Sequence, residues 1–223
     1  MHATGEPVQR PEPKRLAKRN PENSRRILIT ATLDTIAESG ITDTSVSKIV
    51  ERAGLSRGMI HLHFGGKQQL LAAAARAFAD AYYKELDRHI ALAEPDPETV
   101  LRAVIRADLG KALLNERAVR IWHAFRGAAP TSEGIARFSS TRDRRLRNII
   151  ERSLREIGTG YGPACDPQLV QAATLGLLAL LEGMWVDYLS NGRAFSRNAA
   201  NVIILRFMKG LFPNHFGPDP QLS

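Results

Sequence analysis

The chain has little of several features that define whole classes of protein. It contains one cysteine, Cys165, among 223 residues, which excludes an internal disulfide framework and fits a reducing compartment. Its longest apolar run, residues 172–181, ends at Glu182 and is shorter than the roughly 18 residues that a membrane span needs. Residues 1–22 are basic but have no apolar core, so they lack the pattern of a secretory signal. These absences predict a cytoplasmic protein with no membrane partner.

Signatures of catalysis and of metal binding are also missing. The chain has no paired carboxylates, no nucleophile beside a base and no cofactor loop at the required spacing. His61 and His63 are two residues apart, which places their rings on different sides of a helix, and no cysteine or carboxylate cluster accompanies them. We therefore expect no enzyme activity, no cofactor and no metal site.

Positive charge, by contrast, is in excess. The chain has a formal net charge of +8 and a pI near 10.1, which favours polyanions as partners. The charge is concentrated in residues 10–26, where seven lysines and arginines accompany two glutamates. Residues 1–20 are predicted to form a basic arm, and two interpretations stay open. The arm either adds phosphate or minor-groove contacts to DNA, or is a disordered terminus that only aids solubility.

Apolar residues recur with helical spacing along nearly the whole chain, and no segment alternates convincingly as a strand does. Breaks rich in glycine and proline divide the pattern into helices expected near residues 21–39, 46–53, 57–64, 66–92, 97–114, 115–128, 131–157, 166–191 and 196–212. The predicted fold is therefore all-α. It comprises the basic arm, a three-helix head at residues 21–66, a larger helical body at residues 67–212 and a flexible tail at residues 213–223.

Residues 44–67 have the pattern of a helix-turn-helix. Gly54 follows the first short helix, where a left-handed residue commonly ends a helix, and Ser56 stands where its side chain can cap the second. In a helix-turn-helix the second helix enters the DNA major groove. Apolar or small residues lie where the two crossing helices must touch, at Ile49, Ala53, Leu55, Ile60 and Phe64.

The same stretch closely resembles the DNA-binding segment of the TetR family of transcriptional regulators. Where the family often has Tyr-x-Tyr, this chain has His61-Leu62-His63, which implies an operator sequence of its own. The resemblance implies a regulator, usually a repressor, that binds operator DNA. The matching elements, at the spacing of the family, are Thr44-Ser45, Ile49, Ala53-Gly54-Leu55-Ser56, Gly58, Phe64 and Lys67.

DNA contacts are expected on the face of the second helix that points away from Ile60. Arg57 can donate two hydrogen bonds to a guanine, and Gly58 lets the backbone approach the groove closely. Met59 and Leu62 can touch thymine methyls. Side chains at the start of the preceding and following helices are expected near phosphates. The predicted DNA-binding residues are Ser45, Ser47, Lys48, Arg57, Gly58, Met59, His61, His63 and Lys67.

Aromatic residues in the body suggest a ligand site. Trp122 and Phe125 are three residues apart, as are Trp185 and Tyr188, so each pair lies on one helix face. The faces of such rings attract a quaternary ammonium group, for which a carboxylate can supply the countercharge. The alternative is that the same rings only pack the helical core.

Together with the arginine-rich segment 142–147, these motifs resemble the C-terminal domain of the BetI-like branch of the TetR family, in which BetI responds to choline. This chain has Arg126 where a second aromatic residue would follow Phe125. The resemblance extends over about residues 22–212 and implies a small-molecule effector of cationic, choline-like character. The predicted ligand-binding residues are Asp108, Trp122, Phe125, Glu182, Trp185 and Tyr188.

The last two helices are expected to form a homodimer interface. Residues 170–184 carry an apolar stripe, and residues 202–211 are apolar over much of the helix circumference. Gly176, Ala179 and Gly183 permit close approach between helices. Two such helices from each subunit would form a four-helix interface, and a two-fold dimer presents two recognition helices to a palindromic operator. The alternative is that both helices pack within one monomer.

The sequence thus predicts a ligand-responsive, homodimeric DNA-binding transcriptional regulator, a repressor that a small molecule releases from DNA. Two other functions stay open. A sequence-independent DNA-binding protein would bind operator and random DNA alike. An enzyme that carries a helical DNA-binding head would turn over a substrate.

Overall fold

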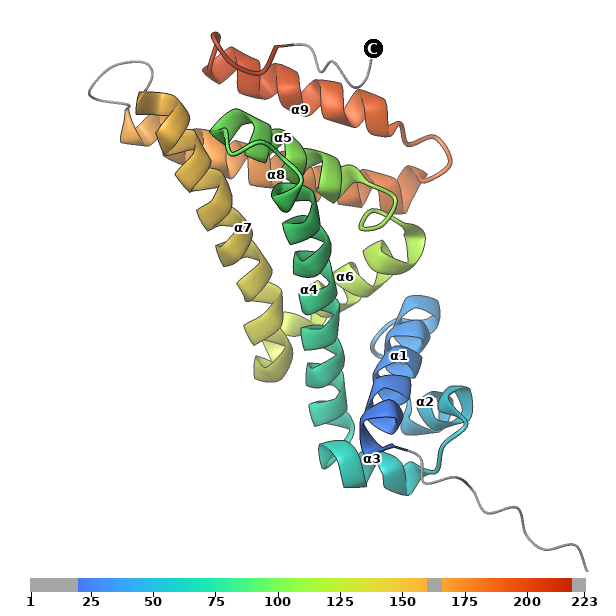
Figure 1. Cartoon of the computed structure of the whole chain (residues 1–223). Helices are drawn as coiled ribbons and strands as arrows, with labels where there is room; N and C mark the ends of the chain where they lie inside the picture. Colours follow the sequence, from blue (N-terminus) through green and yellow to red (C-terminus); the bar gives the residue numbers. More distant parts are fainter. Residues whose placement is uncertain (1–19, 160–165, 218–223) are drawn as a thin grey trace, which may run out of the picture.

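The computed structural model describes residues 20–159 and 166–217, apart from the side chains of residues 139–143. These residues form helices joined by turns, so the all-α prediction is confirmed for this part of the chain (Figure 1). Cys165 and the predicted basic arm up to residue 19 lie outside the described residues. The helices are α1 (Pro21–Ser39), α2 (Val46–Ala53), α3 (Arg57–Phe64), α4 (Lys67–Ala91), α5 (Pro97–Leu109), α6 (Glu116–Ala128), the 3₁₀ turn η1 (Ala129–Thr131), α7 (Glu133–Thr159), α8 (Pro167–Asn191) and α9 (Arg197–Leu211).

Helix α4 connects a small head to a larger body. The head, α1 to α3, lies at one end of the molecule, and α4 runs from it into the body, where α5 and α7 pack against it (Figure 1). The 25 residues of α4 span roughly 37 Å. Helices α8 and α9 lie at the end of the body farthest from the head (Figure 1). A shift of α4 within the body therefore moves its first turns at the head.

The head has its own apolar core. Leu28 of α1, Ile49 of α2 and Ile60 of α3 are buried together with Leu70 from the start of α4. The apolar contacts predicted for the helix-turn-helix pack around this core and are confirmed. The packing of the head thus continues past residue 66 into the first turn of α4.

A second apolar cluster joins the head to the body. Leu33 and Ile36 of α1 pack with Leu71 of α4 and with Ile121 and Phe125 of α6. All of these side chains are at least nine-tenths buried. Helix α1 is therefore shared, with one face in the core of the head and another against α6 of the body.

Helix α5 ends earlier than the sequence predicts. It stops at Leu109, and a turn follows in which Leu113 and Leu114 are buried. The N–H groups of both leucines bond to the carbonyl of Gly110, and Arg197 of α9 donates to the carbonyls of Leu109 (3.0 Å) and Leu114 (2.7 Å). The apolar spacing continued through this turn, so the sequence pattern alone did not reveal the break.

The prediction of a flexible tail from residue 213 onward is wrong for residues 213–217. Phe216 is buried against the body core, and its N–H donates to Oε1 of Glu98 on α5 (3.0 Å). Arg102 donates to the same oxygen (2.8 Å) and to the carbonyl of Gly217 (2.8 Å). The contacts of Phe216 with Glu98 and of Gly217 with Arg102 join positions more than a hundred residues apart, which local sequence patterns do not report. The rest of the predicted tail lies outside the described residues.

We expect Glu98→Gln to lower the free energy of unfolding by about 2 kcal/mol at neutral pH, because charge-assisted hydrogen bonds are lost. Burial raises the pKa of this carboxyl, but hydrogen bonds from Arg102, His215 and the Phe216 N–H hold the pKa below its ordinary value of 4.5. A carboxyl whose pKa is lowered by folding stabilises the folded state at pH values above its ordinary pKa of 4.5. This contribution is lost as the pH falls through the pKa of the folded state. The unfolding free energies of parent and variant in urea should therefore converge as the pH falls below the lowered pKa of Glu98.

The control is Glu133→Gln, because Glu133 is exposed and lies 3.9 Å from Arg137 in an ion pair along one helix. It should change the free energy of unfolding by less than about 0.5 kcal/mol. Equal losses in the Glu98 and Glu133 variants would show that the tail is not fastened by Glu98.

Helix α8 is long and apolar enough to cross a membrane, judged by length and composition alone, and it is the one such helix in the described residues. Its most apolar 18-residue window has a mean hydropathy of 1.6, and 33% of that window is buried. The prediction that no segment is apolar enough to span a membrane rested on uninterrupted apolar runs. It is wrong when the mean hydropathy of an 18-residue window is used instead. Much of the apolar surface of α8 is thus left exposed in the single chain.

Candidate functional site

Helices α2 and α3 and the turn between them form the predicted helix-turn-helix. Ser45 caps α2 by accepting a hydrogen bond from the N–H of Lys48 (3.2 Å). Gly54 ends α2 at φ +60° and ψ +36°, the left-handed region that favours glycine. Ser56 precedes α3, but its side chain makes no capping bond, and its carbonyl accepts from the N–H of Met59 instead (3.1 Å). The turn is therefore confirmed, and the predicted side-chain cap is wrong.

The face of α3 that points away from the head core carries most of the predicted base contacts. Arg57, Gly58 and His61 are exposed, and Met59 is half-buried. Leu62 is 74% exposed. Helix α3 itself lies at the end of the head, beside the start of α4 (Figure 1).

Arg57 is held by a neighbour on the other helix of the motif. Its Nη2 donates to Oγ of Ser47 on α2 (2.7 Å). An arginine reads a guanine through two parallel hydrogen bonds, which requires a fixed guanidinium plane. Ser47 therefore orients Arg57, a role that the sequence did not indicate.

His63 is less available to DNA than predicted. Its Nε2 is buried and has no hydrogen-bond partner among the described residues. Its carbonyl accepts a hydrogen bond from Arg25, whose guanidinium also lies over the ring of Phe64, 4.4 Å from the centroid. The sequence groups Arg25 with the basic N-terminal segment, but the structure places it in α1, where it holds the end of α3.

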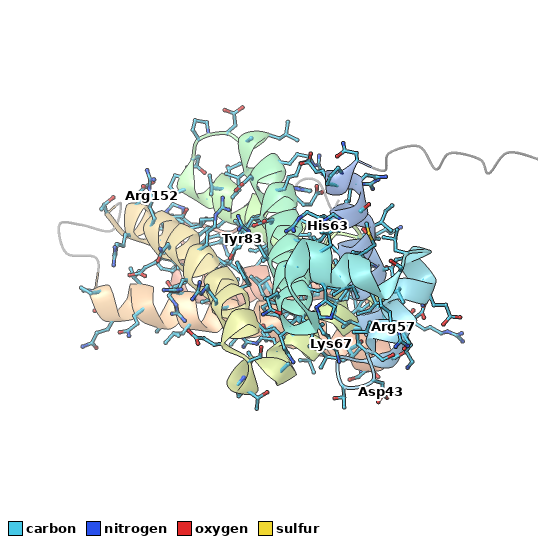
Figure 2. All side chains as sticks on the ribbon, turned by 90° about the horizontal axis from the view of Figure 1, so that it is seen from below. Asp43, Arg57, His63, Lys67, Tyr83 and Arg152 are labelled. Carbon is cyan, nitrogen blue, oxygen red and sulfur yellow. The ribbon has the colours of Figure 1, made fainter. Side chains whose placement is uncertain are left out.

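Two lysines flank the recognition helix. Lys48 is exposed on α2, with its Nζ 3.5 Å from Oγ of Ser39. Lys67 is the first residue of α4 and is half-buried. Figure 2 shows Arg57 and Lys67 at the same end of the molecule, seen from below. Cations thus border α3 where a DNA backbone would run beside the groove.

Three of the six predicted ligand-binding residues form one buried group. Asp108 of α5 is fully buried and accepts hydrogen bonds from the hydroxyl of Tyr82 (2.6 Å) and from Nε1 of Trp185 (2.9 Å). The ring of Trp185 packs edge-on against Trp122, with 6.3 Å between the centroids. The carboxyl of Asp108 therefore fixes the orientation of a tyrosine on α4 and a tryptophan on α8.

Of the other three, Glu182 touches this group, whereas Phe125 and Tyr188 have other partners. Phe125 belongs to the cluster between head and body. Glu182 accepts a hydrogen bond from Nε1 of Trp122 (3.3 Å). Tyr188 packs against Phe195, 5.4 Å between centroids. The structure does not gather the six residues around one cavity.

A cavity of about 340 Å³ lies between the head and the body. Its volume is within the range of small-molecule sites. Of the six predicted residues, Trp185 lines this cavity, and Asp108 accepts hydrogen bonds from two of the lining side chains, Tyr82 and Trp185. The sequence reasoning missed the wall from α4, whose signal was the spacing of Phe78 and Tyr82. Some of the lining residues are aromatic or charged, and one belongs to the head. They are Phe78, Tyr82, Trp185, Glu85, Arg117 and, from the head, Leu33.

The cavity has one group of each charge. Hydrogen bonds from Arg88 lower the pKa of Glu85 below its ordinary value of 4.5, so Glu85 is negatively charged at neutral pH. Arg117 of α6 donates to Oδ1 of Asp34 on α1 (2.7 Å). The positive group is therefore bound to the head, and the negative group belongs to α4.

Comparison with known protein families gives one match for the head and one for the body. Residues 28–74 match the model described as bacterial regulatory proteins of the tetR family. Residues 97–213 match the model of the BetI-type transcriptional repressor C-terminal domain. The two matches cover the helix-turn-helix with the start of α4, and the body from α5 to α9.

Similar proteins carry the same description. The HTH-type transcriptional regulator BetI of Stenotrophomonas maltophilia is 33% identical over 163 residues, which cover 73% of this chain and 79% of the relative. The BetI regulator of Yersinia pestis is 28% identical, with 83% and 90% of the two chains covered.

Solved structures support the fold. A transcriptional regulator from Pseudomonas aeruginosa PAO1 has a TM-score of 0.80 and 29% identity, covering 90% of this chain and 95% of its own. A Saccharomonospora viridis regulator solved in complex with choline has a TM-score of 0.71 and 19% identity, covering 84% and 96%. With the family matches and the geometry of the head, these similarities establish that the chain belongs to the TetR family of transcriptional regulators and has a BetI-type C-terminal domain.

Proposed function

We propose that this regulator is a cytoplasmic homodimeric repressor that leaves a palindromic operator when a small organic cation binds in the cavity between head and body. The observation that carries the proposal is the position of the cavity, since its walls come from α1 of the head and from α4, α6 and α8 of the body. A bound molecule thus touches both parts. It changes DNA affinity if it binds more tightly to one arrangement of head and body than to another. A tenfold loss of operator affinity needs about 1.4 kcal/mol of coupling.

The chemistry of the walls supports a cation. The walls include the half-buried ring of Phe78, the buried rings of Tyr82 and Trp185, and Glu85, whose carboxylate is also paired with Arg88. Aromatic rings beside a carboxylate attract quaternary ammonium groups. The choline complex of the Saccharomonospora viridis regulator supports the same class. A larger hollow of about 690 Å³ lies near α1, α2 and α6, but Ala37 is its single apolar lining residue. That hollow therefore suits an organic cation less well.

The exposed surface of α8 and α9 supports a homodimer. Leu175 and Val186 of α8 and Ile203 of α9 are between 46% and 50% exposed. On α8, Gly183 is exposed between these leucine and valine positions, and a Cβ built there meets no atom within 4 Å. An apolar helix face with a small residue at its centre permits close packing against the same face of a second copy.

The proposal is tested by gel shift with the promoter regions that flank the gene, with and without choline. The control ligand is 3,3-dimethyl-1-butanol, which has the shape of choline but no charge. We expect a discrete complex that choline weakens at least tenfold and that the alcohol leaves intact. Equal action of both compounds would overturn the cationic class.

Competition with random DNA in the same experiment separates the other functions. Equal affinity for promoter and random DNA would identify a sequence-independent binder, whereas an operator is expected to bind about a thousandfold more tightly. A compound that is consumed rather than bound would indicate an enzyme.

A further inference from the structure

Leu62 is an exposed apolar residue on the helix that enters DNA. It is 74% exposed near the C-terminal end of α3, while Ile60 on the same helix is 1% exposed in the head core. The other strongly exposed apolar residues of the described chain lie on α8 and α9 or at Leu92, which is beyond the end of α4. Leu62 is therefore part of neither the core nor the proposed dimer surface.

Gly58 makes the surface beside Leu62 open. The two residues are four positions apart on α3 and share one helix face. A Cβ built at Gly58 would meet only Oγ of Ser56, at 3.9 Å. The missing side chain leaves a shallow space next to the Leu62 side chain, bordered by the polar residues Arg57 and His61.

The major groove offers one apolar group that suits this space. The base edges present hydrogen-bond donors and acceptors there, with the exception of the C5 methyl group of thymine. A leucine forms no hydrogen bond with the donors and acceptors, but it gains free energy by burying a methyl. The backbone at Gly58 permits the close approach that such a contact needs.

We propose that Leu62 is a specificity-determining residue that selects thymine at one position of each half-site by contact with the thymine methyl over Gly58. The inference goes beyond the assignment of α3 as the recognition helix, because it assigns a base and a chemical group to one side chain. It rests on DNA binding by α3 and is independent of the effector.

The test removes the methyl without changing any hydrogen bond. The preferred operator is first selected from random duplexes with the full chain, and each thymine is then replaced in turn by deoxyuridine. We expect one thymine per half-site whose replacement weakens binding about fourfold, the value of one buried methyl. Replacement of the remaining thymines should have little effect.

The variant Leu62→Ala should weaken binding to the thymine operator and show no difference between thymine and deoxyuridine at that position. Leu92→Ala is the matched control, because Leu92 is similarly exposed, at 76%, and lies away from the head. It should keep both affinity and methyl discrimination. Two outcomes would overturn the proposal: no thymine sensitive to loss of its methyl, or a sensitivity that Leu62→Ala retains. Failure to select any preferred operator would instead count against sequence-specific binding itself.

Discussion

Gly183→Arg is expected to convert the proposed dimer to a monomer and to weaken operator binding by at least about a hundredfold, the scale of lost bivalency. Gly183 lies on the exposed face of α8, and a Cβ there meets no atom of the same chain within 4 Å. An arginine therefore fits the single chain. It does not fit between two closely packed copies of α8, where it would also bury an unpaired charge. Sedimentation equilibrium gives the mass, and a gel shift gives the affinity.

Gly127→Arg is the matched control. Gly127 is also exposed within a helix, α6, and a Cβ there also meets nothing within 4 Å. Both substitutions replace a poor helix former by a good one and add the same charge, but only Gly183 lies on the proposed interface. A dimer that survives Gly183→Arg would place the interface elsewhere.

The second large effect is expected at Arg57. Arg57→Ala should lower the preference for operator over random DNA by about 1–3 kcal/mol in each half-site, the value of a bidentate guanine contact. Binding to random DNA should change much less, because phosphate contacts dominate there. The ratio of the two affinities, measured at one salt concentration, is the readout.

Ser47→Ala tests how Arg57 acts. The hydroxyl of Ser47 accepts a hydrogen bond from Arg57 (2.7 Å), so its removal leaves the guanidinium in place but less well fixed. We expect a smaller loss of preference at the same base pair. If Arg57→Ala leaves operator selection unchanged, Arg57 is a solvated side chain and base reading belongs to other residues of α3.

The helix-turn-helix was predictable because its determinants are local. Gly54 must adopt a left-handed conformation, and Ile49 and Ile60 must meet across a three-residue turn, so residue type and spacing report the geometry directly. Capping was less predictable. Ser56 has the right residue type and position, but its side chain makes no capping bond, because its identity does not fix its rotamer.

The cavity and the tail were not predictable because their contacts are not local. Asp108 bonds to Tyr82 and to Trp185, which are 26 and 77 positions away, and Phe216 bonds to Glu98, 118 positions away. Spacing within one helix identified Trp185 as a candidate but gave no sign of which helix would face it. The aromatic pattern therefore identified candidate rings, while the partners of each ring depended on how the helices pack.

The ion pair between Arg117 and Asp34 makes one contact between head and body depend on ionic strength. Its side chains are 47% and 32% exposed, so dissolved salt screens it, and a pair of this kind is worth up to about 1 kcal/mol. That amount is close to the coupling needed for a tenfold change in operator affinity. Asp34 is in the head and Arg117 is in the body. A rise in salt thus weakens an ion pair between head and body and the attraction to DNA phosphates in the same molecule.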